Sequence, residues 1–428
     1  MAEYLAPALE GADIVDTVEA NGLELAYEQF GSDADPALLL IMGLGTQLLG
    51  WPDAFCRALA EAGLRVIRFD NRDIGLSTKL RTAKGYDTAH QAFFKSVMNR
   101  PISTAYSLDD MATDTLGLMD ALDIDRAHLV GASMGGMIAQ LVAGEYPERV
   151  ASLTSIMSST SARNLPRGKL KILLRLAKAP KSRDPDVIAA HMAKTMRMIS
   201  SPHMGRTQAD WQAELRRMVE RSYYPAGTAR QTLAVLAARS REDLLGGVHC
   251  PVLVIHGKAD PLLPVKHGRA TAAALPECRY EEIPGMGHDL PLRLLPRFVG
   301  WISALAHRAE NARVDAPGAA TMANEAETSP DEALEVVPAP KESARPQPTK
   351  PGPGRTEPWL DEPSADDALA GDRAGRGSAR VEPSLEEPAQ EAPERLPPDQ
   401  ARSSDGTVGN NKRIGPLGKL FEKRRSGR

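Results

Sequence analysis

The sequence predicts an α/β protein built on a doubly wound, mostly parallel β-sheet. Short, continuous apolar runs alternate along the chain with segments of helical period, and Gly, Pro, Asp or Ser residues bound the runs. The runs are Ala37–Met42, Leu64–Phe69, Ala127–Val130, Val150–Ile156 and Val252–Ile255. Continuous apolarity over so few residues is typical of strands buried on both faces. The alternating order of strands and helices then favours parallel pairing, with helices on both faces of the sheet.

A hairpin and three helices complete this outline of the fold. The hairpin is expected over Thr17–Phe30, because Asn21-Gly22 lies between alternating apolar residues. Ser107, followed three residues later by Asp110, resembles a capping box at a helix N-terminus. The expected helices are Asp53–Ala62, Ser107–Leu122 and Met134–Glu145.

Composition divides the 428 residues into a domain and a tail. The strand and helix patterns extend over residues 14–307 and are interrupted by residues 161–239, which are basic, Met-rich and helical in character. We expect a helical insertion there. Residues 308–428 are rich in Pro, Glu and Arg and almost lack aromatic residues, so they cannot bury enough apolar surface to offset chain entropy. This tail is expected to be disordered.

The end of the tail, Lys412–Arg428, mixes apolar and basic residues. It is either a basic amphipathic anchor for an anionic surface or partner, or a solvated basic tail. Gly415, Pro416 and Gly418 argue against a stable helix and favour the second interpretation.

The net charge indicates which partners to expect, and the cysteines indicate the cellular compartment. A formal net charge of −4 gives no reason to expect nucleic acid as a partner. Cys56, Cys250 and Cys278 lie far apart and form no disulfide framework. The first 16 residues lack the pattern of a signal peptide, and no run approaches the roughly 18 apolar residues that span a bilayer. We therefore expect a cytoplasmic protein with no integral membrane segment.

The strongest functional motif is centred on Ser133. Residues 131–136 read GASMGG, directly after an apolar strand and directly before a segment of helical period. This is the context of the G-x-S-x-G nucleophile elbow, in which a tight strand-to-helix turn projects the serine hydroxyl above the sheet. A helix N-terminus at this point favours developing negative charge.

Asp260 and His288 are the expected partners of this serine. A serine hydroxyl is a weak nucleophile until a base takes its proton, and in this arrangement an acid and then a histidine follow the serine along the chain. Each of the two residues follows a strand, at the sheet edge where open α/β folds bind ligands. The same order leaves His256 to support the acid turn and Asp289 to point elsewhere. His128 is expected either to pack in its strand or to lie exposed at an edge, and His267 to open a helix.

Acyl transfer also needs two hydrogen-bond donors for the oxyanion. The backbone N–H of Met134 is the first, because Met134 follows the nucleophile. The second is expected in the glycine-rich loop after the strand at 37–42, where Leu44 is the first choice and Gly43 the next. This loop has neither the G-x-G-x-x-G nor the Walker pattern of a phosphate-binding loop.

Together these motifs resemble the α/β-hydrolase family. Ser133 lies in GASMGG, Asp260 in HGKADPLLP and His288 in GMGHDLP. Residues 70–77, DNRDIGLS, resemble the family turn D-x-R-G-x-G-x-S, with Asp73 where Gly is usual. Within the family, residues 43–78 are similar to the aclacinomycin methylesterase-like branch. The resemblance covers roughly residues 20–305.

The resemblance implies an α/β-hydrolase fold with residues 161–239 as the lid. It implies hydrolysis of a small or medium apolar carboxylic ester through an acyl-enzyme, with neither cofactor nor metal. Many relatives have His before the glycine of the oxyanion loop, where this chain has Met42, but backbone donors do not depend on that side chain.

Other activities remain open on the same three residues, because fold and function are loosely tied. They are lactone, thioester or carbon–carbon bond hydrolysis, and cofactor-free perhydrolysis. A hypothesis of another class is a ligand-binding or scaffold module whose tail recruits a partner. The lid methionines either line an adaptable apolar pocket or fill the core of the lid.

Overall fold

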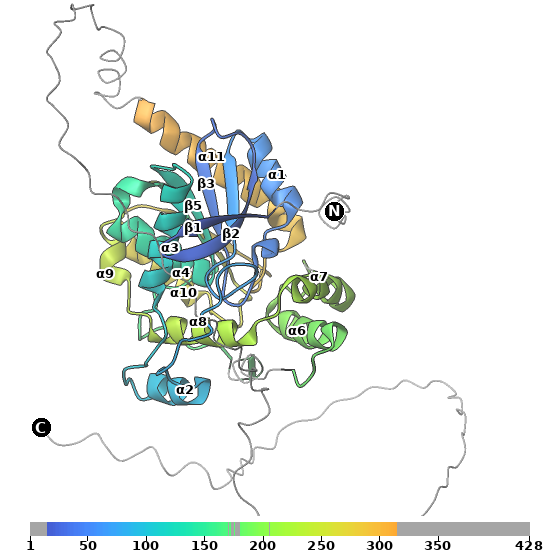
Figure 1. Ribbon diagram of the computed structural model, residues 1–428. Helices are drawn as coiled ribbons and strands as arrows, with labels where there is room; N and C mark the ends of the chain where they lie inside the picture. The colour runs from blue at the N-terminus through green and yellow to red at the C-terminus, as the bar shows by residue number, and fades with distance from the viewer. Residues whose placement is uncertain (1–14, 170, 173–174, 176–179, 205, 315–428) are drawn as a thin grey trace, which may run out of the picture. The chain divides into compact units, whose positions relative to one another are not determined.

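The computed structural model describes residues 15–314, apart from residues 170, 173–174, 176–179 and 205 (Figure 1). The predicted disordered tail and its basic end, Lys412–Arg428, therefore lie almost entirely outside the described residues, and both remain predictions. The division into a domain and a lid at residue numbers 14, 161, 239 and 307 likewise remains a prediction.

The described residues form an eight-stranded sheet in the order β1-β2-β4-β3-β5-β6-β7-β8. Its strands are β1 (Asp16–Ala20), β2 (Leu23–Phe30), β3 (Ala37–Ile41), β4 (Arg65–Phe69), β5 (Ala127–Ala132), β6 (Val150–Ile156), β7 (Val252–Gly257) and β8 (Arg279–Ile283). The β1–β2 and β2–β4 pairs are antiparallel, whereas every pair from β4 to β8 is parallel. The predicted doubly wound, mostly parallel sheet is confirmed.

Helices follow most of the strands (Figure 1). They are α1 (Asp53–Glu61), α2 (Ala89–Val97), α3 (Leu108–Ala121), α4 (Met134–Glu145), α6 (Pro185–Ile199), α7 (Gln208–Arg221), α8 (Pro225–Ala237), α9 (Glu242–Leu245), α10 (Lys266–Ala274) and α11 (Leu295–Val314). Short 3₁₀ turns cover Leu48–Gly50, Pro147–Arg149 and Leu292–Leu294. All three predicted helices are present. The predicted capping box is confirmed as well, because Ser107 Oγ accepts from the Asp110 N–H while the Asp110 carboxylate accepts from the Ser107 N–H.

Two apolar cores cover the two faces of the sheet. In β3, Leu38 and Leu40 pack with the side chains of α1 and α11, whereas Leu39 and Ile41 pack with those of α3 and α4. Successive side chains of a strand point to opposite faces, so a strand covered on both sides must be apolar throughout. This explains why β3 reads as an unbroken apolar run.

Helices α6, α7 and α8 lie within the residues predicted as the lid and connect β6 to β7. Three of the lid methionines, Met192, Met196 and Met218, pack with Trp211 and Leu215 between α6 and α7. These three residues therefore fill the core of the lid. The sequence did not predict α2, which lies between β4 and α3 and packs against α8 (Figure 1). Within the described residues, no helix is both long and apolar enough to cross a bilayer.

His128 is packed inside β5, which is the first of the two placements that the sequence left open. Its Nδ1 lies 2.9 Å from Ser152 Oγ, and its Nε2 lies 3.4 Å from Glu310 Oε1. Burial, with a smaller contribution from the nearby positive charges of Arg126 and His307, lowers the pKa of His128 to about 4. The ring is therefore neutral in the folded protein at neutral pH.

We expect His128 to make the domain sensitive to acid. Between pH 6.5, the usual histidine pKa, and about pH 4, the unfolded chain holds a proton that the folded chain lacks, so stability falls as the pH falls. The contribution is at most about 3.5 kcal/mol, since each pKa unit corresponds to about 1.4 kcal/mol. His128→Gln should flatten the pH dependence of the unfolding free energy over this interval, measured by urea denaturation. An unchanged slope would show that the buried ring takes up a proton as easily as an exposed one.

Candidate active site

Ser133 occupies a strained turn between β5 and α4. Its backbone has φ 55° and ψ −116°, a conformation that costs energy for any residue with a Cβ. The packing around it leaves no room for side chains at the flanking glycines. A Cβ at Gly131 would lie 2.2 Å from the carbonyl oxygen of Gly135, and a Cβ at Gly135 would lie 2.0 Å from that of Ile41. The tight crossing of strand and helix therefore requires both glycines.

The structure brings the three residues predicted from the sequence into hydrogen-bond contact. The Ser133 hydroxyl lies 3.0 Å from His288 Nε2, and His288 Nδ1 lies 2.7 Å from Asp260 Oδ2. Asp260 follows β7 and His288 follows β8, so both lie beyond the carboxyl ends of parallel strands. The two side chains are buried, whereas Ser133 is partly accessible. The chain of contacts can carry a proton from the hydroxyl to the imidazole.

The turn after β7 holds the Asp260 carboxylate in one orientation. Its Oδ1 accepts hydrogen bonds from the N–H groups of Leu262 and Leu263, each at 2.8 Å. Burial by itself would raise the pKa of Asp260, but the charge of His288 and its hydrogen bond, with help from His256 and the Leu263 N–H, hold that pKa below its usual value. Asp260 is thus an ionised acceptor for the imidazole.

His256 supports this turn from the side. Its Nε2–H donates to the carbonyl oxygen of Leu263 at 2.8 Å, and Nε2 also lies 3.6 Å from Asp260 Oδ2. The ring is buried, and burial lowers the pKa of His256. The contact matches the supporting role that the sequence suggested for this residue.

A second network, which the sequence did not predict, holds the loop that carries His288. Asp289 Oδ1 accepts from the Ser201 backbone N–H at 2.8 Å and from the Ser201 hydroxyl at 2.6 Å. The Ser201 oxygen accepts from the Gly287 N–H at 2.8 Å, and the His288 N–H donates to the Ile199 carbonyl at 2.7 Å. The loop is therefore bound to the C-terminal end of α6. Burial raises the pKa of Asp289, although the Ser201 hydrogen bonds oppose that shift.

The loop after β3 passes over the nucleophile. A Cβ at Gly43 would lie 3.8 Å from Ser133 Oγ, so the backbone of this loop is close to the hydroxyl. The Gly45 N–H is already engaged, because it donates to Gln231 Oε1 of α8 at 2.9 Å. Leu44 precedes Gly45 in the loop, and Met134 is the first residue of α4, so both predicted oxyanion donors are in elements that adjoin Ser133.

Asp73, which stands where the resembled turn D-x-R-G-x-G-x-S has Gly, pairs with α8, a helix of the predicted lid. It retains the left-handed conformation, with φ 70°. Its two carboxylate oxygens accept from Nε and Nη2 of Arg230 in α8, each at 2.8 Å, and Oδ1 also accepts from the Leu80 N–H. Asp73 and Arg230 are both almost fully buried. The ion pair therefore fixes α8 to the turn after β4.

Asp70, three residues earlier in the same turn, anchors α7. Its Oδ2 lies 2.7 Å from Arg221 Nη1, and the same nitrogen donates to Gln47 Oε1 at 2.8 Å. The Gln47 amide nitrogen donates to the carbonyl oxygens of Met218 and Ser222 around the end of α7. One turn of the chain thus binds two helices of the lid.

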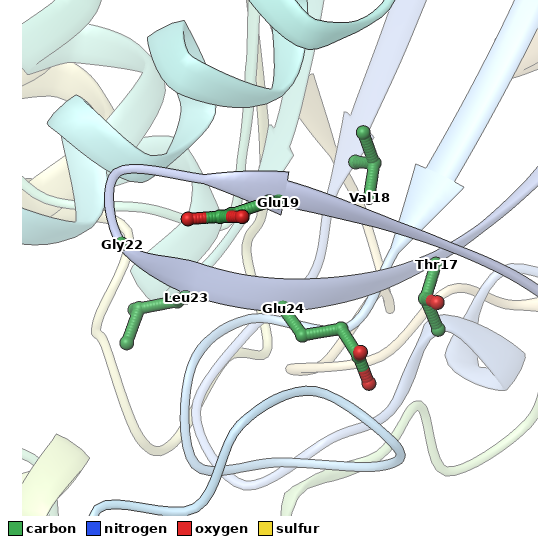
Figure 2. A pocket seen from close by; sticks show the side chains of 6 residues that line it. All are labelled: Thr17, Val18, Glu19, Gly22, Leu23 and Glu24. Atoms are coloured by element: carbon green, nitrogen blue, oxygen red, sulfur yellow. The ribbon is translucent and has the colours of Figure 1, made fainter. Parts of the chain in front are cut away.

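Other features of the described residues lie away from Ser133. A hollow of about 260 Å³ follows the β1–β2 hairpin (Figure 2). Glu19 lies directly opposite Glu24 there. Two like charges that face each other repel, so both carboxylates are better solvated by water than enclosed by a bound ligand. A second hollow, of about 230 Å³, adjoins His128 and Glu310. In the part of the chain that the structure describes, no three His, Cys, Asp or Glu side chains are arranged to hold a metal ion.

Known proteins resemble this chain in sequence and in fold. A family model described as the alpha/beta hydrolase fold matches residues 36–292. A rhodomycin D methylesterase of Streptomyces sp. (strain C5) is 31% identical over 298 residues, which cover 64% of this chain and 92% of that protein. The rhodomycin D methylesterase of Streptomyces peucetius is 30% identical, over 62% of this chain and 89% of that protein. The crystal structure of the enol-lactonase from Burkholderia xenovorans LB400 superposes with a TM-score of 0.52 at 23% identity, covering 68% of this chain and 99% of that one.

We expect Asp73→Gly to destabilise the protein even though glycine relieves the left-handed backbone. The substitution leaves the buried Arg230 cation without its carboxylate, which should lower the unfolding free energy by about 3–5 kcal/mol in guanidinium denaturation. The double variant Asp73→Gly/Arg230→Met removes the stranded charge and should recover a large part of the loss. A single variant more stable than the wild type would show that backbone strain outweighs the ion pair.

Proposed function

The chain belongs to the alpha/beta hydrolase fold family, and from that premise we propose that it is a serine hydrolase that cleaves carboxylic esters through an acyl-enzyme. The observation that carries the proposal is the continuous contact from Ser133 Oγ to His288 Nε2 at 3.0 Å and from His288 Nδ1 to Asp260 Oδ2 at 2.7 Å. Nucleophile, base and orienting acid are recognised by this geometry and not by position in the chain.

In the proposed reaction Ser133 Oγ attacks the ester carbonyl while its proton passes to His288 Nε2. Asp260 accepts the hydrogen bond from Nδ1, so the imidazole keeps the tautomer whose Nε2 is free to act as a base. His288 then gives the proton to the departing alkoxide, and an alcohol leaves. Water, activated by the same imidazole, attacks the acyl-enzyme and releases the carboxylic acid.

The backbone N–H groups of Met134 and Leu44 are the proposed donors to the oxyanion. Met134 opens α4, where the first N–H groups have no partner within the helix and the helix dipole favours negative charge. Leu44 is supported by the closeness of its loop to Ser133 Oγ and by the engagement of the neighbouring Gly45 N–H with Gln231. Donors that are already oriented stabilise the transition state without reorganisation.

Ester cleavage is preferred because the two relatives described above are named as methylesterases. The three residues themselves do not distinguish an ester from a lactone, a thioester, a carbon–carbon bond or a peracid-forming reaction. A small or medium apolar molecule is the substrate class that the sequence resemblance implies, and this remains part of the proposal.

We expect Ser133→Ala to abolish both hydrolysis of short p-nitrophenyl esters and covalent labelling by a fluorophosphonate. The substitution removes the oxygen that forms the acyl-enzyme, so the rate of hydrolysis should fall by about 10⁴-fold or more. Only the slow hydrolysis that substrate binding and the oxyanion donors still support would remain. Ser303→Ala, on α11, is the control and should retain both activities. Hydrolysis that survives in Ser133→Ala would exclude Ser133 as the nucleophile. A wild type that is labelled but barely hydrolyses esters would favour the lactone, thioester, carbon–carbon or ligand-binding hypotheses.

We expect Asp260→Asn to lower kcat by about 10⁴-fold with little change in KM, as loss of the orienting carboxylate does in serine proteases. The asparagine oxygen can still accept from Leu262 and Leu263, which separates the effect on the imidazole from an effect on folding. Steady-state kinetics on a p-nitrophenyl ester measure both constants. If Asp289→Asn reproduces this loss and Asp260→Asn does not, the orienting acid is Asp289.

A further inference from the structure

Helix α2 turns its apolar side chains toward solvent. Phe93, Phe94, Val97 and Met98, at the end of the helix, have exposed fractions between 42% and 64%. Residues at this spacing share one face of a helix, whereas the buried Ala92 lies on the opposite face. A contiguous exposed apolar surface of this kind on a soluble domain marks an interaction site more often than a chance arrangement. We call these four side chains the α2 face.

Specific contacts hold α2 with this face outward. Thr88 and Gln91 form a capping box at its N-terminus. Lys95 Nζ lies 2.8 Å from both carboxylate oxygens of Asp87, and Asp87 also accepts from the Ser103 N–H. The inner side of α2 packs against α8. The orientation of the α2 face is thus set by its neighbours and is not the product of a frayed helix end.

Two arginines, Arg167 and Arg100, adjoin the α2 face. Arg167 donates to the Ser96 carbonyl at 3.0 Å and so attaches a basic segment of the lid to α2. Every charged side chain in residues 161–183 is Lys or Arg. Several of these are exposed, among them Arg167 itself and Lys169 two residues after it. Arg100, which is also exposed, follows Met98 by two residues. Asp87, the acid next to α2, is already paired with Lys95.

We propose that the α2 face docks on an anionic lipid surface. The aromatic and aliphatic side chains would enter the boundary between headgroups and acyl chains, while Arg100, Arg167 and the basic segment that Arg167 attaches to α2 lie against the anionic headgroups. An apolar helix face with cations beside it can bind such a surface through both apolar burial and charge attraction. The helix lies on the surface and does not span the bilayer.

The charge pattern disfavours a second copy of the chain as the occupant. A symmetric dimer through the α2 face would bring the same patch of both molecules together. Arg100 and Arg167 of one copy would then approach those of the other, and like charges across an interface oppose association. An anionic lipid surface supplies the opposite charge over the whole patch.

The position of α2 connects this surface to the proposed site. α8 contacts α2 and also binds the loop after β3, through Gln231 and Gly45. Docking through α2 would therefore place the lid side of the domain against the lipid, where apolar esters concentrate. The docking proposal itself rests on the α2 face and its charges and holds whether or not Ser133 is a nucleophile.

The test is flotation of the full-length protein with vesicles of phosphatidylcholine, with or without phosphatidylglycerol. The wild type should float with the anionic vesicles, float less as salt rises, and stay behind with pure phosphatidylcholine. Phe94→Asp/Val97→Asp should weaken binding to the anionic vesicles by about tenfold or more, because it places charge in the inserted face. Val187→Asp, at a comparably exposed apolar position on α6, is the matched control and should bind as the wild type does. Thermal melting followed by circular dichroism establishes that the variants are folded.

Three outcomes would overturn the proposal. Undiminished flotation of the folded Phe94→Asp/Val97→Asp variant would assign lipid binding to another part of the chain, such as Lys412–Arg428. Equal flotation with both kinds of vesicle would show that the cations do not contribute to lipid binding. A wild type that fails to float but sediments as a dimer, with the variant a monomer, would identify the α2 face as an interface between copies of the chain.

Discussion

The close crossing of β5 and α4 at Ser133 is the constraint on which the rest of the site depends. Gly131 and Gly135 lack the Cβ atoms that would strike neighbouring backbone, so the helix can begin immediately above the strand. Ser133 is thereby held in a left-handed conformation that its surroundings must stabilise. Because β5 lies between β3 and β6 in the sheet, the loop after β3 passes over the hydroxyl, and the turns after β7 and β8 approach it from the other side.

Helices α6, α7 and α8, the predicted lid, are joined to this centre by buried polar contacts. Asp70 and Asp73, in one turn after β4, bind α7 and α8 through Arg221 and Arg230. On the opposite side, Ser201 at the end of α6 binds the loop that carries His288. A change in the position of α6 would therefore also move the loop that carries the His288 imidazole. Desolvation offsets much of the attraction within such buried ion pairs, but removing one partner leaves the other charge buried and uncompensated.

Two buried aspartates of the site show that, at similar burial, the partners of a carboxylate decide whether its pKa rises or falls. The pKa of Asp260 is held below its usual value because an imidazole and two backbone N–H groups face the carboxylate. The pKa of Asp289 is raised, because burial there outweighs the hydrogen bonds from Ser201. The same residue type at similar burial is thus suited to orient a base in one place and to fasten a loop in the other.

The sequence by itself determined the features that depend on neighbours along the chain: the apolar runs of the strands, the capping box at Ser107, the turn at Ser133, and the order in which Asp260 and His288 follow it. Local periodicity and turn chemistry record these directly. Outside these motifs, only the tertiary structure decided which distant side chains meet. Asp73 and Arg230, or Ser201 and Asp289, are joined across long stretches of chain, and no local pattern records such pairings. The outward face of α2 was hidden for the same reason, since the sequence shows that a segment is apolar but not whether anything covers it.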